Sequence, residues 1–195
     1  MNEKDYHSLA EFGLNIAPVP LKLEGKDRDL VGYGSYLVNA AGDCNGCHSA
    51  GPQSEFLPGH NPYFANQGPT EVNPDTYLGG GRNFGPLGSR SPDIISRNLT
   101  PDKTGLPEGG TSFKEFVEIM RTGVDFDHLH PNCVDANSTD CLDPPFDGSR
   151  LQIMPWPIYR NMSNRDLLAI YTYLSAVPCV PHTLADGEIY HDCGP

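Results

Sequence analysis

Cys44-Asn45-Gly46-Cys47-His48 is the stretch of sequence that decides the fold. A C-x-x-C-H run is the attachment signature of a c-type haem, because each thiol can add to one vinyl group of the porphyrin and the histidine that follows can ligate the iron. We therefore predict thioether bonds at Cys44 and Cys47 and an iron–histidine bond at His48. The chain contains one such run, so one covalently attached haem c is expected.

Two other interpretations of the paired thiols stay open. A thioredoxin-like redox dithiol would need a β-α-β context, which the neighbouring sequence does not provide. Half of a zinc site would need two further ligands at comparable spacing. Both interpretations fit the residues around the motif less well than a haem does.

The composition indicates a chain rich in loops. Gly (21) and Pro (19) are abundant among the 195 residues, and hydrophobic residues make up only 37%. A porphyrin buried among loops would supply apolar surface that the side chains do not. No segment alternates convincingly between apolar and polar residues, so we expect an all-α protein with few helices and long loops around one haem.

The formal net charge of −12 restricts the partners. It makes nucleic acid and anionic membrane surfaces poor partners and favours basic docking surfaces on protein redox partners, unless it serves only solubility. No apolar run reaches the roughly 18 residues of a transmembrane segment. The first residues do not form a signal peptide, although haem attachment follows export, so we expect a periplasmic or extracellular protein numbered from a mature or re-engineered N-terminus.

Helical periodicity predicts three helices. The first is expected to begin near Asp29 and to run into the haem motif, with Gly34 at a close crossing of two helices. Capping boxes start the other two helices, at Ser112 and at Ser163. We expect the second to end at Thr122-Gly123 and the third to stop before Pro178, while residues 49–110 form a long loop region.

Four cysteines remain beside the haem motif, and an even number in an exported protein predicts two disulfides. We favour the local pairs Cys133–Cys141 and Cys179–Cys193, although the first pair could instead be redox-active. The expected organisation is an extended arm (1–28), a haem domain (29–181) with a Cys-bearing insertion (125–150), and a tail (182–195) tied by a disulfide.

The sixth iron ligand decides between an electron carrier and a ligand-binding or catalytic haem. Met154 is the preferred candidate, because it stands in a proline-bounded loop just before the last helix. Met120 is expected in the core, and Met162 in a hydrophobic staple with Leu167. We expect Trp156 to pack on the porphyrin edge or to donate its N–H to a propionate. The histidines that could replace methionine are His60, His128, His130, His182 and His191.

Several motifs resemble those of class I cytochromes c. They are residues 32–43 leading into the C-x-x-C-H run, Asn98 to Asp102, and Met154 to Tyr159. More narrowly, the chain is similar to the cytochrome c modules of bacterial membrane-associated alcohol, aldehyde and sugar dehydrogenases. The resemblance implies the cytochrome c fold, with the first and last helices crossing at Gly34 against Tyr171 or Tyr173. It also implies thioethers at both cysteines of the motif and His48 and Met154 as the iron ligands.

These observations predict an exported monohaem cytochrome that transfers single electrons between redox partners and is not itself an enzyme. Two alternatives stay open. The chain could be an electron-transfer subunit of a larger dehydrogenase or respiratory complex, with residues 1–28 and 125–150 as docking elements. It could also be a haem enzyme or a gas sensor with a labile sixth ligand.

Overall fold

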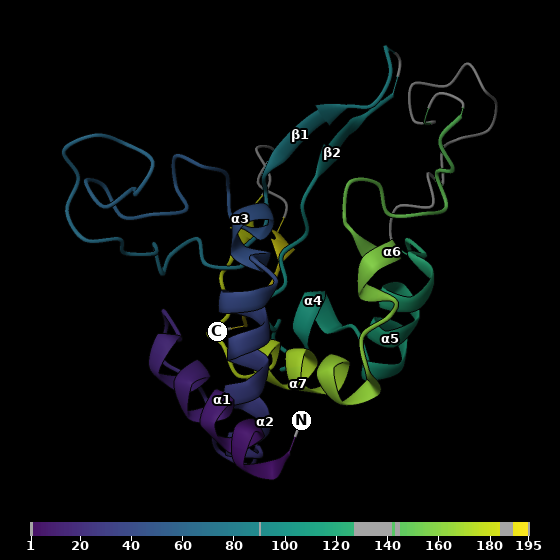
Figure 1. Ribbon diagram of the computed structural model, residues 1–195. Helices are drawn as coiled ribbons and strands as arrows, with labels where there is room; N and C mark the ends of the chain where they lie inside the picture. The colour runs from purple at the N-terminus through teal and green to yellow at the C-terminus, as the bar shows by residue number, and fades with distance from the viewer. Residues whose placement is uncertain (1, 90, 127–141, 143–144, 184–188, 195) are drawn as a thin grey trace.

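The computed structural model describes residues 2–89, 91–126, 142, 145–183 and 189–194 (Figure 1). Helices form the body of the protein, and long loops connect them. In chain order the described elements are α1 (Glu3–Ile16), α2 (Arg28–Tyr36), a π-helix η1 (Leu37–Ala41), α3 (Cys44–His48), β1 (Asn83–Pro86), β2 (Asp93–Ile95), α4 (Pro107–Gly110), α5 (Phe113–Thr122), α6 (Trp156–Tyr159), α7 (Asn164–Leu174), β3 (His182–Thr183) and β4 (Ile189–His191).

The first 28 residues are not the extended arm that the sequence predicts, because α1 occupies half of them. The side chain of Asn2 caps this helix by accepting a hydrogen bond from the Asp5 N–H at 2.9 Å. Helix α1 packs along α2 and buries Tyr6, Ala10 and Gly13 (Figure 1). Leu9 and Leu14 also pack against the core, so apolar residues recur at helical spacing and the prediction overlooked a periodicity that the sequence contains.

Helix α2 begins slightly earlier than predicted. Its N-cap is Asp27, whose side chain accepts a hydrogen bond from the Leu30 N–H at 3.0 Å. Asp29 lies in the first turn instead, where a carboxylate interacts favourably with the helix dipole. The helix continues into η1 and then, past Gly42 and Asp43, reaches the haem motif on α3.

Helices α2 and α7 cross at Gly34, as the sequence predicts. A Cβ atom on Gly34 would lie 2.0 Å from the carbonyl oxygen of Ala169 and 2.7 Å from the Cβ of Tyr173. Of the two tyrosines considered, Tyr173 is therefore the one at the crossing. Both capping boxes are also confirmed, at Ser112 for α5 and at Ser163 for α7.

We expect Gly34→Ala to lower the free energy of unfolding by about 1–3 kcal/mol, because the added methyl group pushes two packed helices apart. Gly34→Val should lower it further. Urea denaturation followed by far-UV circular dichroism measures both values. If Gly34→Val lowers the free energy of unfolding no more than Gly34→Ala does, steric contact at this crossing does not limit the size of residue 34.

Two short antiparallel strand pairs depart from a purely helical structure. Strand β1 pairs with β2, and β3 pairs with β4, each with an irregular register. The strands have two to four residues, too few to produce a recognisable alternation in sequence. The helical elements still form the body of the protein, and the β1–β2 pair extends away from it (Figure 1).

The C-terminal tail is fastened as predicted. Cys179 and Cys193 form a disulfide, and Lys103 lies 2.8 Å from the carboxylate of Asp192. The predicted pair Cys133–Cys141 lies outside the described residues. Of the helices in the described ranges, none combines the length and the apolar character needed to cross a membrane.

Candidate haem-binding site

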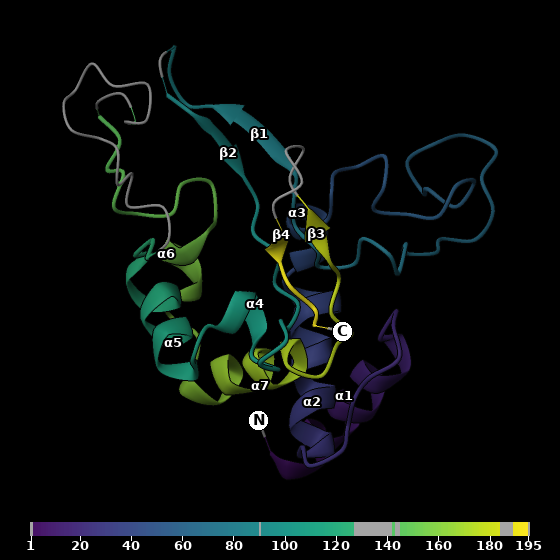
Figure 2. The same ribbon diagram turned by 180° about the vertical axis from the view of Figure 1, so that it is seen from behind.

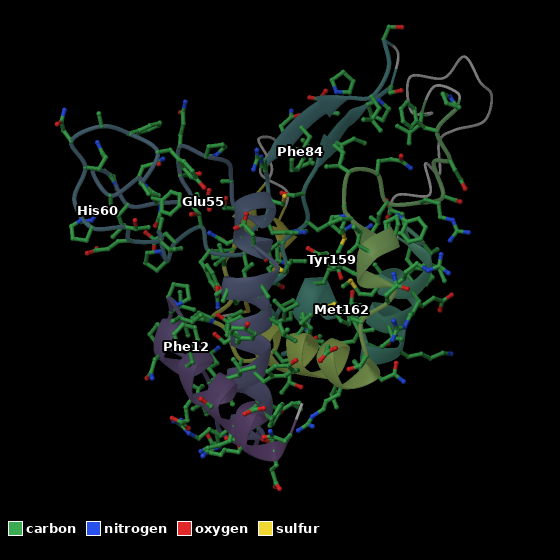
Figure 3. The ribbon with its side chains drawn as sticks, in the orientation of Figure 1. Phe12, Glu55, His60, Phe84, Tyr159 and Met162 are labelled. Carbon is green, nitrogen blue, oxygen red and sulfur yellow. A yellow bond between two sulfur atoms is a disulfide. The ribbon has the colours of Figure 1, made fainter. Side chains whose placement is uncertain are left out.

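The four ligand residues predicted from the sequence line one cavity of about 440 Å³. Cys44, Cys47 and His48 lie on α3, while Met154 lies in the loop before α6. Figure 3 shows side chains of α6 and the following turn, Tyr159 and Met162, on the side that faces α3. Apolar side chains form most of the wall, among them Leu37, Val38, Leu99, Phe116, Ile119, Ile170 and Leu174.

The imidazole of His48 is oriented by the backbone of the segment after β2. Its Nδ1 lies 2.8 Å from the carbonyl oxygen of Arg97. Because a carbonyl oxygen can only accept, Nδ1 carries the proton and Nε2 keeps its lone pair. Burial lowers the pKa of His48, so the imidazole is neutral at neutral pH. A neutral imidazole with a free Nε2 is the form that ligates a metal.

The two cysteines of the motif are free thiols. Burial raises the pKa of Cys44 to about 12, and the nearby Asp43 and Cys47 add to the increase. Redox-active dithiols use a lowered thiol pKa, so this environment is unlike that of a thioredoxin-type pair. Within the described residues, no group of three or more His, Cys, Asp and Glu side chains could hold a metal ion such as zinc.

Backbone strain is concentrated around the cavity. Among the described residues five non-glycine residues have positive φ, and three of these line the cavity: Asp43 (47°), Glu108 (52°) and Ile153 (69°). Such conformations cost about 1–3 kcal/mol each and cluster at functional sites. Asp43 directly precedes Cys44, and Ile153 directly precedes Met154. The strained backbone therefore adjoins predicted ligands on both sides of the cavity.

Of the methionines that the structure describes, three line the cavity rather than one. Met120 is buried in the core as expected, and Met162 is partly buried at the turn before α7, but both also reach the cavity wall. Met154 lies in a tight loop, where its N–H donates to the carbonyl of Gln152 at 2.7 Å, and Met162 lies in a turn, where its N–H donates to the carbonyl of Tyr159 at 2.9 Å. The Met154 carbonyl accepts from the Trp156 N–H at 2.8 Å.

Of the two roles expected for Trp156, the structure bears on donation of its indole N–H to a propionate, while packing on a porphyrin edge stays a prediction. The indole N–H donates to the carbonyl oxygen of Leu151 at 3.1 Å. The ring covers Gly123, whose Cβ would lie 2.2 Å from the Trp156 Cε2 atom. Because α5 ends at this glycine, the indole fixes the loop before α6 to α5. The donor is thus already used within the protein.

The histidines considered as alternatives to Met154, where their side chains are described, lie away from the cavity. His60 stands in the loop between α3 and β1 (Figure 3), with Nδ1 2.8 Å from the carbonyl oxygen of Pro69. His191 is buried, with Nε2 3.3 Å from the hydroxyl of Thr100. Of the histidine side chains that the structure describes, His48 alone lines the cavity. His128, His130 and the side chain of His182 lie outside the described part.

A buried ionic cluster that sequence reasoning missed forms another part of the wall. The Arg97 side chain is 10% exposed, lies 3.1 Å from Glu108 and also pairs with Asp125. All three residues line the cavity. Asp125 begins the insertion 125–150, so the described part of this insertion contributes to the site. The single sequence signal was the position of Arg97 directly before the Asn98 motif.

A hydroxyl network supports the π-helix that leads into the haem motif. The Tyr77 hydroxyl donates to Asn39 Oδ1 at 2.5 Å and lies 2.7 Å from the hydroxyl of Tyr173. Both tyrosines are fully buried, and burial raises the pKa of each. Asn39 lies in η1, so the network joins this irregular turn to α7 and to the loop before β1.

We expect Tyr77→Phe to lower the free energy of unfolding by about 1–3 kcal/mol, because the partly buried side-chain carbonyl of Asn39 loses its donor. Chemical denaturation measures the change. Tyr63→Phe is the matched control, since the Tyr63 side chain is exposed and its hydroxyl remains solvated in either state. An equal effect of both variants would show that the buried network is not the cause.

Comparisons with known proteins give two partial similarities. A gluconate 2-dehydrogenase cytochrome c subunit of Pantoea cypripedii is 32% identical over 162 residues, which are 82% of this chain and 26% of that protein. A nicotinate dehydrogenase subunit of Pseudomonas putida is 30% identical over 140 residues, which are 70% of this chain and 8% of that protein. The chain thus spans about a quarter of the first relative's length and less of the second's.

No protein-family model matches the chain. No solved structure matches it either. The evidence for similarity to known proteins therefore consists of these two sequence relatives and the sequence motifs.

Proposed function

We propose that this chain is a c-type cytochrome domain that transfers single electrons as a subunit of a dehydrogenase assembly. The observation that carries the proposal is the convergence of Cys44, Cys47, His48 and Met154 on one apolar cavity. The similarity to a protein described as a cytochrome c subunit, over 82% of this chain, supports it. A mainly helical cytochrome c fold with long loops around one haem belongs to the same proposal.

The residues of the cavity fit a covalently held haem. Cys44 and Cys47 would form the thioethers, and His48, through Nε2, and Met154 would bind the iron. When bound, the haem iron supplies a one-electron couple. The apolar part of the wall would pack on a bound porphyrin, and a methionine ligand would favour a higher reduction potential than a second histidine.

The chain acts as an electron-transfer component rather than as a catalytic subunit. If both His48 and Met154 bind the iron, no coordination position would be left for a substrate. Both relatives are described as subunits, which favours membership of an assembly over an independent shuttle. The assembly would lie in the periplasm or outside the cell, because haem is attached to this motif after export.

Absorption spectroscopy of the oxidised and reduced protein tests the proposal. We expect a six-coordinate, low-spin haem that stays attached in denaturant and does not bind carbon monoxide when reduced. The mass of the denatured chain should exceed the sequence mass by one haem. A protein without covalent haem would refute the proposal, and a reduced form that binds carbon monoxide would favour the haem enzyme or gas sensor.

A further inference from the structure

Residues 51–76 form a loop that projects from the body of the protein, which we call the lobe. It lies on the opposite side of α3 from α5 and α6 (Figures 1 and 2). Its two arms are joined by main-chain bonds: the Leu57 N–H donates to the Glu71 carbonyl at 2.9 Å, and the Asn73 N–H donates to the Glu55 carbonyl at 2.9 Å. Asn61 is buried within it and donates to the Pro52 carbonyl at 3.2 Å. The lobe is therefore ordered before any partner binds, and its ordering does not weaken binding.

The lobe is fastened to the haem motif at its base. It leaves α3 shortly after His48, and the returning chain donates the Gly80 N–H to the His48 carbonyl at 2.7 Å. Gly80 has a φ of 69°, and a Cβ there would lie 2.4 Å from the carbonyl carbon of Arg97. The same Arg97 carbonyl holds the His48 imidazole. A partner bound to the lobe would thus be held by the segment that orients the predicted iron ligand.

Two neighbouring aromatic side chains in the middle of the lobe face solvent. Tyr63 is 83% exposed and Phe64 is 58% exposed, and no other large hydrophobic side chain in the described residues is as exposed as Tyr63. The Tyr63 ring lies edge-on to Phe56, with 6.3 Å between the centroids. Neither Tyr63 nor Phe64 lines the haem cavity, so binding a haem leaves both in water. Exposed aromatic side chains on an ordered loop are typical anchors of a protein interface.

The negative charge of the lobe favours a partner with a basic surface. The lobe contains Glu55, Glu71 and Asp75 and no Lys or Arg. Like charges would oppose a second copy of the same lobe, and the net charge of −12 opposes an anionic membrane surface. A complementary surface would carry Lys or Arg around an apolar pocket.

We propose that the lobe docks this chain on another subunit of its dehydrogenase assembly, with Tyr63 and Phe64 inserted into an apolar pocket that has a basic rim. This inference rests on the proposed function, because it takes the partner to be a redox subunit. It adds which surface makes the contact and which chemistry the partner presents.

The test uses the full haem-loaded chain, tagged and produced in its native host in place of the untagged protein. The assembly is purified through the tag on this chain, and the catalytic dehydrogenase subunit that co-purifies is identified. The affinity of that subunit for each purified variant of this chain is then measured. We expect Tyr63→Ser combined with Phe64→Ser to weaken binding of that subunit at least tenfold. Glu71→Lys, which keeps both aromatic rings, should weaken binding and reduce its dependence on salt. The matched control is Phe12→Ser, at a half-exposed phenylalanine on α1 (Figure 3).

The outcomes separate the docking proposal from the function proposal. Weaker binding by both lobe variants, with unchanged haem spectra and melting temperatures, supports docking through the lobe. Binding equal to wild type overturns it, as does an equal loss in Phe12→Ser. A wild-type dimer that the lobe variants convert to monomer also overturns it, because the occupant is then a second copy. A wild-type protein without haem refutes the proposed function whichever binding is measured.

Discussion

Replacing both Cys44 and Cys47 with alanine is expected to abolish covalent haem attachment completely. Both side chains are free thiols at one cavity wall, and each can form one thioether to the same porphyrin. Without them the remaining candidate contacts, at His48 and Met154, are reversible coordination bonds. The mass of the denatured chain should then equal the sequence mass, whereas the wild-type mass exceeds it by one haem.

Single variants make this expectation sharper. Cys44→Ala and Cys47→Ala should each keep one thioether and therefore retain some haem in denaturant, with different pyridine haemochrome spectra from the wild type. The control is the disulfide pair Cys179 and Cys193, which closes a separation of 14 residues. Alanine at both positions should retain haem while lowering the free energy of unfolding by about 3 kcal/mol. Loss of haem in this control would mean that unfolding, not thioether chemistry, explains the result.

The elements predicted correctly are those with local signals. The capping boxes at Ser112 and Ser163 define α5 and α7, because each box satisfies the first donors of its helix within four residues. Gly34 indicated a close helix crossing, since a glycine inside an apolar helical face needs a reason to be there, and the family resemblance implied that the last helix is the partner. Helix α1 was missed although Tyr6, Leu9, Ala10 and Leu14 recur at helical spacing and pack on the core, so its signal was present in the sequence and overlooked.

In the candidate site, too, the residues that could be predicted are those with a local sequence signal. The C-x-x-C-H run is contiguous, so a sequence can reveal it. The cluster of Arg97, Glu108 and Asp125 joins three separate segments, and its members come together only through the tertiary fold. The positive φ values of Asp43 and Ile153 are likewise imposed by the surrounding structure, because both residue types prefer negative φ.

The choice among methionines is where sequence and structure must be combined. Sequence reasoning placed Met120 in the core and Met162 in a hydrophobic staple, which left Met154 as the ligand. In the structure all three line the cavity, because α5 and the turn before α7 both border it. Burial alone therefore does not identify the sixth iron ligand among the three. The assignment to Met154 depends on the backbone conformation of its loop.

Met154→Ala is expected to open the sixth coordination position, so that the reduced protein changes from binding no carbon monoxide to binding one equivalent per haem. Covalent attachment should persist, since Cys44 and Cys47 are unchanged. Carbon monoxide titration followed by absorption spectroscopy measures the change. Met120→Ala and Met162→Ala are the matched controls, because each removes a thioether from the same cavity wall.

We expect both controls to remain six-coordinate, for a reason that lies in the backbone. Met154 is held between two main-chain hydrogen bonds, to Gln152 and from Trp156, and it follows Ile153 at a φ of 69°. A β-branched residue in this conformation is strained, and such strain persists only where the surrounding structure imposes it. Met120 lies on a regular helix and shows no comparable constraint. If Met162→Ala opens the iron and Met154→Ala does not, the thioether of Met162 is the ligand and the strain at Ile153 serves another purpose.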